Sequence, residues 1–125
     1  MIFARLVVIA LLALLTSNAA EATPKVQYGA EPVPGMVTLI QAGYERCGFC
    51  TVMEGSIEYV AEAFKKNLAV RYVDVLHDVA FRKKYEVDAA PAQLIFGADG
   101  KLLTRHIGFC TKSELLEMLG KVGVR

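Results

Sequence analysis

The chain has 125 residues, with 14 lysines and arginines against 13 aspartates and glutamates, so its formal net charge is +1. Such a mixed, nearly neutral chain lacks the basic footprint of a nucleic-acid-binding protein, and we expect no nucleic-acid partner. Its length suffices for one compact domain with a single hydrophobic core. We therefore expect a small monomer whose partners are not polyanions.

Residues 1–22 have the pattern of a secretory signal peptide. Arg5 gives a positive start, Leu6–Leu15 is an unbroken apolar run, and small residues follow it. This run is much shorter than the ~20 residues that a membrane-spanning helix needs. Cleavage is possible after Ser17-Asn18-Ala19, and Ala20-Glu21-Ala22 fits the A-x-A cleavage pattern better. We predict an exported protein of the bacterial periplasm, with an uncleaved N-terminal anchor as the alternative.

A tether and a folded domain should follow this signal peptide. Residues 23–35 are rich in proline and glycine, which predicts a tether with one short strand near Val26–Tyr28. The folded domain is expected over residues 36–125. Its first strand is predicted at Met36–Ala42, a short apolar run that contains β-branched residues.

The middle of the chain should alternate helix and strand. Apolar residues at steps of three and four predict an amphipathic helix over Gly48–Asn67, which Gly55 should weaken or bend. A strand rich in branched residues is expected over Leu68–Val75. A short helix should then occupy Asp78–Tyr85, with the side chain of Asp78 as its N-terminal cap.

The last part of the chain is predicted to form a hairpin and a helix. Strands over Gln93–Phe96 and Leu102–Gly108 flank turn residues at 98–100. The final helix, Thr111–Val122, should begin with a capping box that Glu114 completes. The order β-α-β-α-β-β-α, with a right-handed crossover between the first two long strands, predicts an α/β fold around a mixed sheet.

Three cysteines are an odd number for an exported protein, so at least one thiol is left over or reactive. Cys47 and Cys50 stand three residues apart where the long helix should begin. Unpaired N–H groups at a helix start stabilise a thiolate and can lower a thiol pKa from ~8.5 into the range ~3.5–7.5. Cys47 is therefore the predicted attacking thiolate and Cys50 the resolving thiol, while the charge of Arg46 should favour the thiolate further.

These features together resemble the thioredoxin family over residues 36–122. The motif Cys47-Gly48-Phe49-Cys50 lies between a buried strand and a long helix, and a proline loop follows about forty residues later. The resemblance implies a thioredoxin-like fold with helices on both faces of the sheet. It also implies an enzyme that exchanges thiols and disulfides with protein substrates, using the Cys47–Cys50 disulfide and no bound cofactor or metal.

Further positions match the binding surface of that family. Pro91 corresponds to the family's cis-proline, which implies a cis bond between Ala90 and Pro91. Gly108 corresponds to a glycine that borders the surface. With Phe49, we predict that Ala90, Pro91 and Gly108 contact substrate.

The departures from the family pattern concern the surroundings of the disulfide. Arg46 stands where thioredoxins carry tryptophan, Phe49 where they carry proline, and Gln41 where they bury an aspartate that helps proton transfer. Arg46 and Gln41 are therefore expected to tune the redox properties. Gly55 replaces the usual helix-kinking proline. A glycine-aromatic dipeptide and the segment 96–119 are similar to exported proteins that take electrons from a membrane thiol transporter of the DsbD/CcdA kind, which favours a reductase.

Two functional alternatives stay open. One is a periplasmic disulfide oxidase or isomerase built on the same motif. The other is a redox-inert or metal-binding interaction module, because His106 and Cys110 could complete a zinc ligand set with Cys47 and Cys50. Cys110 is interpreted as a small buried apolar side chain that packs on Leu115, with a regulatory disulfide as its alternative.

Overall fold

The computed structural model describes residues 26–125, so the predicted signal peptide, residues 1–22, lies outside the described residues. The described part contains five strands and three helices. In chain order they are β1 (Gln27–Tyr28), β2 (Val37–Gly43), α2 (Gly48–Ala63), β3 (Leu68–Asp74), α3 (Val79–Lys84), β4 (Ala92–Phe96), β5 (Leu102–Ile107) and α4 (Lys112–Lys121). None of these helices is long and apolar enough to cross a membrane.

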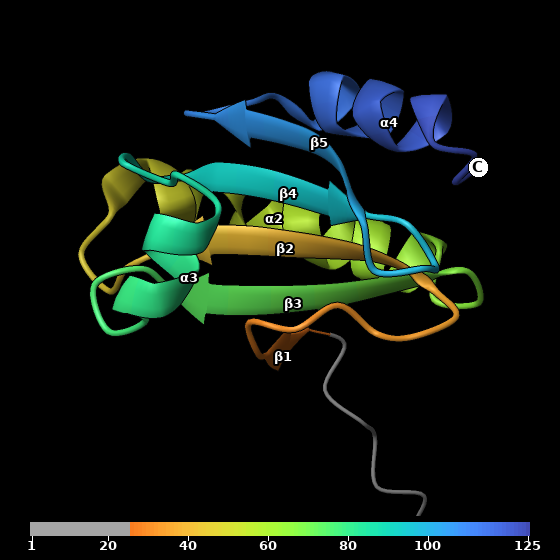
Figure 1. Cartoon of the computed structure of the whole chain (residues 1–125). Coiled ribbons are helices and arrows are strands. Elements are labelled where there is room, and N and C mark those ends of the chain that lie inside the picture. The colour runs from red at the N-terminus through yellow and green to blue at the C-terminus, as the bar shows by residue number, and fades with distance from the viewer. Residues whose placement is uncertain (1–25) are drawn as a thin grey trace, which may run out of the picture.

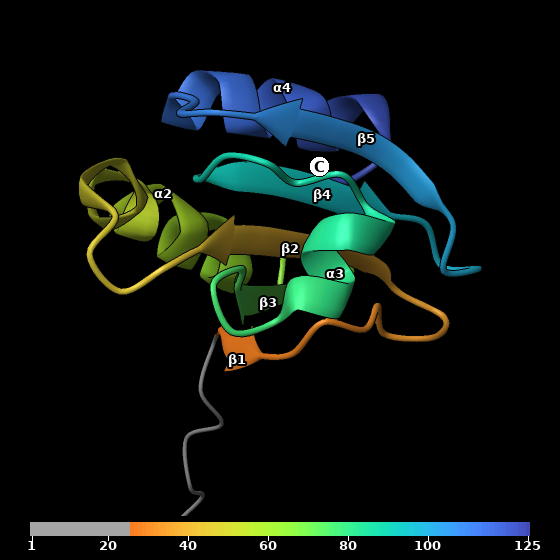
Figure 2. The same ribbon diagram turned by 60° about the vertical axis from the view of Figure 1, so that its left-hand side comes forward.

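The five strands form one mixed sheet in the order β1-β3-β2-β4-β5 (Figure 1). Strands β1, β3 and β2 are parallel, whereas β4 is antiparallel to β2 and β5 is antiparallel to β4. Helices α2 and α4 cover one face of the sheet and α3 covers the other, as the two views in Figure 1 and Figure 2 show. The predicted α/β architecture is confirmed.

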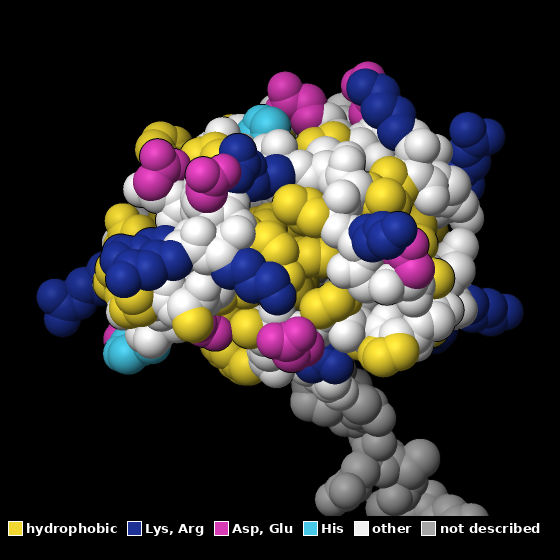
Figure 3. Space-filling model, in the orientation of Figure 1, with side chains coloured by type: hydrophobic (Ala, Val, Ile, Leu, Met, Phe, Trp, Pro, Cys, Tyr) yellow, Lys and Arg dark blue, Asp and Glu magenta, His cyan; other side chains and the backbone are white. Residues whose placement is uncertain are grey.

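The alternation of side chains along the central strands divides the core into two halves. Leu39 of β2 points toward α2 and α4, and the next residue, Ile40, points toward α3. Every residue of β4 is buried, because it pairs on both sides and is covered on both faces. On the face that carries α3, basic and acidic side chains are interspersed around an apolar centre (Figure 3).

The helix starts agree with the predicted caps. The side chain of Asp78 accepts a hydrogen bond from the N–H of Phe81 at 2.8 Å. Thr111 and Glu114 form both bonds of the capping box, at 3.2 Å and 2.6 Å. These caps satisfy N–H groups that would otherwise lack partners at the helix ends.

Apart from the end of α2, the helix and strand boundaries lie within one residue of the predictions. Helix α2 ends at Ala63 rather than Asn67, because Phe64 caps it and a turn then leads the chain into β3. The same helix runs without a break through Gly55, so the predicted weakness produces no interruption. Strand β5 ends at Ile107, because Gly108 has a φ of 108°, outside the extended region.

Candidate redox site

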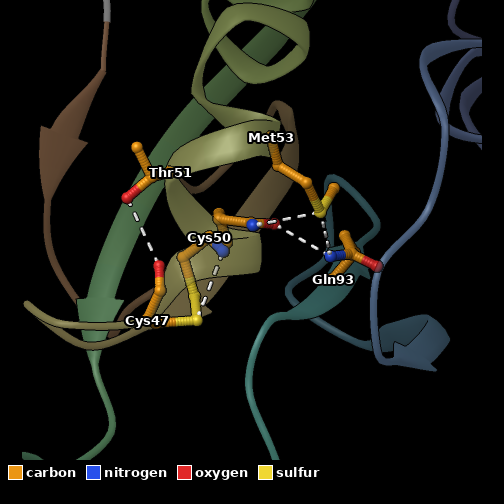
Figure 4. The surroundings of a disulfide bond; sticks show 6 residues. Cys47, Cys50, Thr51, Met53 and Gln93 are labelled. Atoms are coloured by element: carbon orange, nitrogen blue, oxygen red, sulfur yellow. Dashed lines mark hydrogen bonds between the residues drawn. A yellow bond between two sulfur atoms is a disulfide. The ribbon is translucent and has the colours of Figure 1, made fainter.

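Cys47 and Cys50 form a disulfide at the junction between β2 and α2, with their Cα atoms 5.2 Å apart. Cys47 is the N-cap of α2, and its Sγ accepts a hydrogen bond from the backbone N–H of Cys50 at 3.2 Å. Thr51 then donates its hydroxyl to the carbonyl oxygen of Cys47 at 3.3 Å (Figure 4). The sulfur of Cys47 thus lies at the N-terminal end of α2, where the backbone N–H groups of the first turn have no partner within the helix.

The disulfide is almost buried, whereas residues on either side of it are exposed. Cys47 and Cys50 are 4% and 7% exposed, but Phe49 between them is 66% exposed, and Arg46 is exposed as well. The ring of Phe49 lies against that of Phe109, with centroids 6.0 Å apart. We call Phe49 and Phe109 the aromatic rim. An apolar contact surface therefore adjoins the sulfurs.

The proline loop, which contains Ala90 and Pro91, lies at the same end of the sheet as the C-terminal end of β2, after which the chain leads to Cys47. The Ala90–Pro91 peptide bond is cis, as the sequence resemblance implied. The residue after it, Ala92, pairs with Ala42, near the end of β2. Gly108 donates its N–H to the carbonyl oxygen of Pro91 at 2.7 Å, which holds the loop after β5 against the proline loop. Of the expected substrate contacts, Pro91 is buried and Ala90 and Gly108 are half-buried.

A polar network lies buried beside the helix that carries the disulfide. Gln93 donates to the side-chain oxygen of Gln41 at 3.1 Å and to the sulfur of Met53 at 3.4 Å (Figure 4). Gln41 also donates to Met53 Sδ, at 3.6 Å. His106 Nδ1 lies 2.7 Å from the Gln93 oxygen, which can only accept, so Nδ1 carries the proton. Both glutamines are fully buried, and this network will be called the glutamine network.

The glutamine network was only half visible in the sequence. Gln41 was predicted as a tuning residue, but Gln93 and Met53 were not identified. The signal for Gln93 was its place as a polar residue in the apolar strand Ala92–Phe96. A polar side chain in a strand buried on both faces needs hydrogen-bond partners, and these come from distant parts of the chain.

Cys110 is a free thiol that is only 1% exposed and belongs to the same core cluster as Leu115. Burial raises its pKa to about 11, so it is protonated and unreactive at neutral pH. This agrees with the interpretation of Cys110 as a buried apolar side chain.

The proposed zinc ligand set is not assembled. His106 faces Gln93, and Cys110 packs in the core, while Cys47 and Cys50 are joined to each other. Within residues 26–125, no three histidine, cysteine or acidic side chains come together as metal ligands. The metal-binding alternative therefore lacks a site in the described part of the chain.

Comparison with known proteins places these features in a family. The family model for thioredoxin matches residues 34–121. The chain belongs to the thioredoxin family. With a Cys47–Cys50 disulfide at the start of a helix, it is a thiol–disulfide oxidoreductase.

Relatives of similar sequence agree with the family assignment, and a solved structure agrees with the fold. The chain is 37% identical over 73 residues to the thioredoxin of Mycoplasmoides gallisepticum, covering 58% of this chain and 71% of that one. It is 32% identical over 73 residues to the chloroplastic thioredoxin Y2 of Arabidopsis thaliana, covering 58% of this chain and 43% of that one. A mutant thioredoxin from Halobacterium salinarum has the same fold, with a TM-score of 0.67 at 23% identity, over 81% of this chain and 94% of that chain.

Proposed function

We propose that the chain is an exported reductase that opens disulfides in protein substrates. The observation that supports this most directly is the hydrogen bond from the Cys50 N–H to Cys47 Sγ at the N-cap of α2. When the disulfide is reduced, the same N–H and the helix dipole stabilise a thiolate on Cys47. The thiolate is the form of cysteine that attacks a disulfide.

The reaction takes two exchange steps. The Cys47 thiolate attacks one sulfur of the substrate disulfide, a mixed disulfide forms, and the other substrate sulfur leaves as a thiolate that takes a proton from water. Cys50 then loses its proton and attacks Cys47 Sγ. The bond between Cys47 and the substrate breaks, and the Cys47–Cys50 disulfide forms. Two electrons pass from the protein dithiol to the substrate, which is released as two thiols.

Each predicted substrate contact has a distinct part in this scheme. Phe49, together with its neighbour Phe109 in the aromatic rim, offers exposed apolar area beside the sulfurs, which suits an unfolded or loosely folded segment of substrate. Ala90 and Pro91 lie in the proline loop, and Gly108 lies in the loop after β5. The hydrogen bond from the Gly108 N–H to the Pro91 carbonyl oxygen holds these two loops together. We propose that substrate backbone lies between these loops and the rim.

The proposed partners follow from this scheme, and the proposed location follows from the sequence of residues 1–22. Electrons enter and leave through sulfur, so we propose no bound cofactor. The reductant is a second dithiol protein, and the resemblance of residues 96–119 to exported thioredoxin-like proteins favours a membrane thiol transporter. Residues 1–22, acting as a cleaved signal peptide, would deliver the chain to the bacterial periplasm, where disulfides persist.

Insulin reduction by dithiothreitol tests the proposal. The wild-type protein should accelerate precipitation of the insulin B chain, and Cys47→Ser should abolish the acceleration. Reduced Cys50→Ser, freed of dithiothreitol and then mixed with insulin, should accumulate a mixed disulfide that mass spectrometry detects. Cys110→Ala is the matched control and should retain activity, because that thiol is buried and protonated. Full activity of Cys47→Ser would overturn the mechanism.

The direction of electron flow is measured by the reduction potential. When the potential is measured by equilibration with glutathione, a reductase should have a standard potential near ~−270 mV, whereas that of a strong oxidant lies near ~−120 mV. A value close to the second figure would replace the proposed reductase by a disulfide oxidase or isomerase.

A further inference from the structure

The hydroxyl of Tyr72 lies close to the resolving sulfur. A side-chain carbon built on Gly43 would stand 2.6 Å from Tyr72 Oη and 2.9 Å from Cys50 Sγ. The distance between Tyr72 Oη and Cys50 Sγ therefore cannot exceed the sum of these two distances. One water molecule that hydrogen-bonds to both atoms spans a gap of that length. The absence of a side chain at Gly43 keeps the space between them open.

The strand register explains why these groups meet. Gln41 pairs with Tyr72 and Gly43 pairs with Asp74 across the parallel strands β2 and β3. Residues two apart on a strand share a face, so all four lie on the face that α2 covers. Cys50, in the first turn of α2, is packed directly above this corner of the sheet.

Tyr72 and Cys50 also share a cleft that opens to solvent. The cleft has a volume of about 560 Å³ and does not include the aromatic rim, since neither Phe49 nor Phe109 lines it. Its charged and titratable lining comes from every element around it: Glu54 and Glu58 of α2, Asp74 and Tyr72 of β3, Tyr28 of β1, and Glu45 and Tyr44 of the loop before Cys47. Cys50 thus has an outlet to water separate from the surface proposed for substrate.

The Tyr72 hydroxyl is available as a donor. It makes no hydrogen bond to any group of residues 26–125, while the ring of Tyr28 stacks edge-on against its ring with centroids 5.3 Å apart. Burial, followed by the charges of Asp74, Tyr28 and Glu54, raises the pKa of Tyr72 above its ordinary value. The phenol therefore keeps its proton at neutral pH. Gln41, the register partner of Tyr72, is an amide and cannot take up a proton in its place.

We propose that Tyr72 stabilises the thiolate of Cys50 during resolution of the mixed disulfide, by donating a hydrogen bond from its hydroxyl, either directly or through one water in the cleft. This inference rests on the proposed dithiol exchange. The proton of Cys50 passes to cleft water, and from there to solvent. Cys50 sulfur then bonds to Cys47 sulfur, the substrate sulfur departs with the electron pair of the broken bond, and Tyr72 retains its own proton throughout.

The pKa of Cys50 is the decisive readout, because a merely structural role of Tyr72 would not move it. In a Cys47→Ser background, Cys50 is measured by its alkylation rate with iodoacetamide against pH, with mass spectrometry to separate it from Cys110. Adding Tyr72→Phe should raise the Cys50 pKa by about one pH unit, since it removes one hydrogen bond to a charged sulfur. Tyr28→Phe is the matched control: it removes a hydroxyl from the same cleft and should leave the pKa unchanged.

Resolution kinetics give the second readout. With both active cysteines present, Tyr72→Phe should slow resolution of the mixed disulfide about tenfold at neutral pH and shift its pH profile upward, whereas Tyr28→Phe should not. If Tyr72→Phe leaves the Cys50 pKa at the value of Tyr28→Phe, the inference is overturned, while insulin reduction by the wild-type protein still upholds the proposed function. If the pKa shifts but the wild-type protein reduces no disulfide, the hydrogen bond stands and the proposed function fails.

Discussion

The buried glutamine network offers a sharp test of what stabilises the sheet beside the disulfide. Gln93 Nε2 donates a hydrogen bond to Gln41 Oε1 at 3.1 Å, and both side chains are excluded from water. Replacing Gln93 by leucine leaves that buried oxygen without this donor, which costs about 1–3 kcal/mol of unfolding free energy. The Nδ1 of His106 also loses its partner, but His106 is half-exposed and water can replace it.

A double-mutant cycle isolates the interaction between the two amides. Gln41→Leu and Gln93→Leu should each lower the unfolding free energy by about 1–3 kcal/mol, because each leaves polar atoms of the other side chain unpaired. The double variant should cost less than the sum of the two by about 1 kcal/mol or more, because no orphaned amide partner remains.

Urea unfolding of the oxidised protein measures all four species of the cycle. Gln27→Leu on the exposed strand β1 is the control and should change stability by no more than about 0.5 kcal/mol. If the effects of the two core substitutions simply add, the amides do not depend on one another and the reasoning is refuted.

Three further predictions concern single positions. Gly108→Ala should lower the unfolding free energy by about 1–2 kcal/mol, because residue 108 has a φ of 108°. The effect should come from backbone strain alone, since no heavy atom lies within 4 Å of the added carbon. An unchanged urea midpoint would contradict this prediction. Phe109→Ala should raise KM for a disulfide substrate by about three- to tenfold at unchanged reduction potential, since Phe49 loses its partner ring; a change in potential instead would argue against a binding role. The pKa of Glu114 is lowered, chiefly because the N–H of Thr111 donates to its carboxylate, so its stabilisation is present above the unfolded-state pKa and is lost as pH falls through the lower folded-state value. Glu114→Gln should therefore lose less stability than the wild type on acidification below pH 4.5, and equal acid sensitivity would disprove the assignment.

Most helices and strands could be predicted from short stretches of the sequence. The caps at Asp78 and Thr111 depend on residues three positions away, so the chain around each helix start was enough to place it. The motif at Cys47 and Cys50 was likewise local, since its chemistry comes from spacing and from one helix end. The predicted end of α2, at Asn67, was wrong. The helix ends at Ala63 because the chain must turn there to enter β3, and the periodicity of the apolar residues gives no sign of that turn.

The surroundings of the disulfide depended on contacts that no local pattern contains. Gln41 and Gln93 are 52 positions apart, and only the antiparallel register of β2 and β4 brings their amides together. The hydroxyl of Tyr72 lies near the sulfur of Cys50 because β3 is parallel to β2 at a fixed register and Gly43 leaves the space between them free. Residue types along the chain predict strands, but the partners of a side chain follow from how the strands are ordered.

The burial of Cys110 has a consequence for counting electrons. Because the Cys110 sulfur is buried in the core and protonated, the folded chain can accept or give up two electrons, both at Cys47 and Cys50. The odd sulfur therefore takes no part in exchange, and mispairing with the active pair requires the core around Leu115 to open first. A thiol titration of the oxidised protein then reads zero while the chain is folded and one when it unfolds, so the third cysteine serves as a built-in reporter of the folded state.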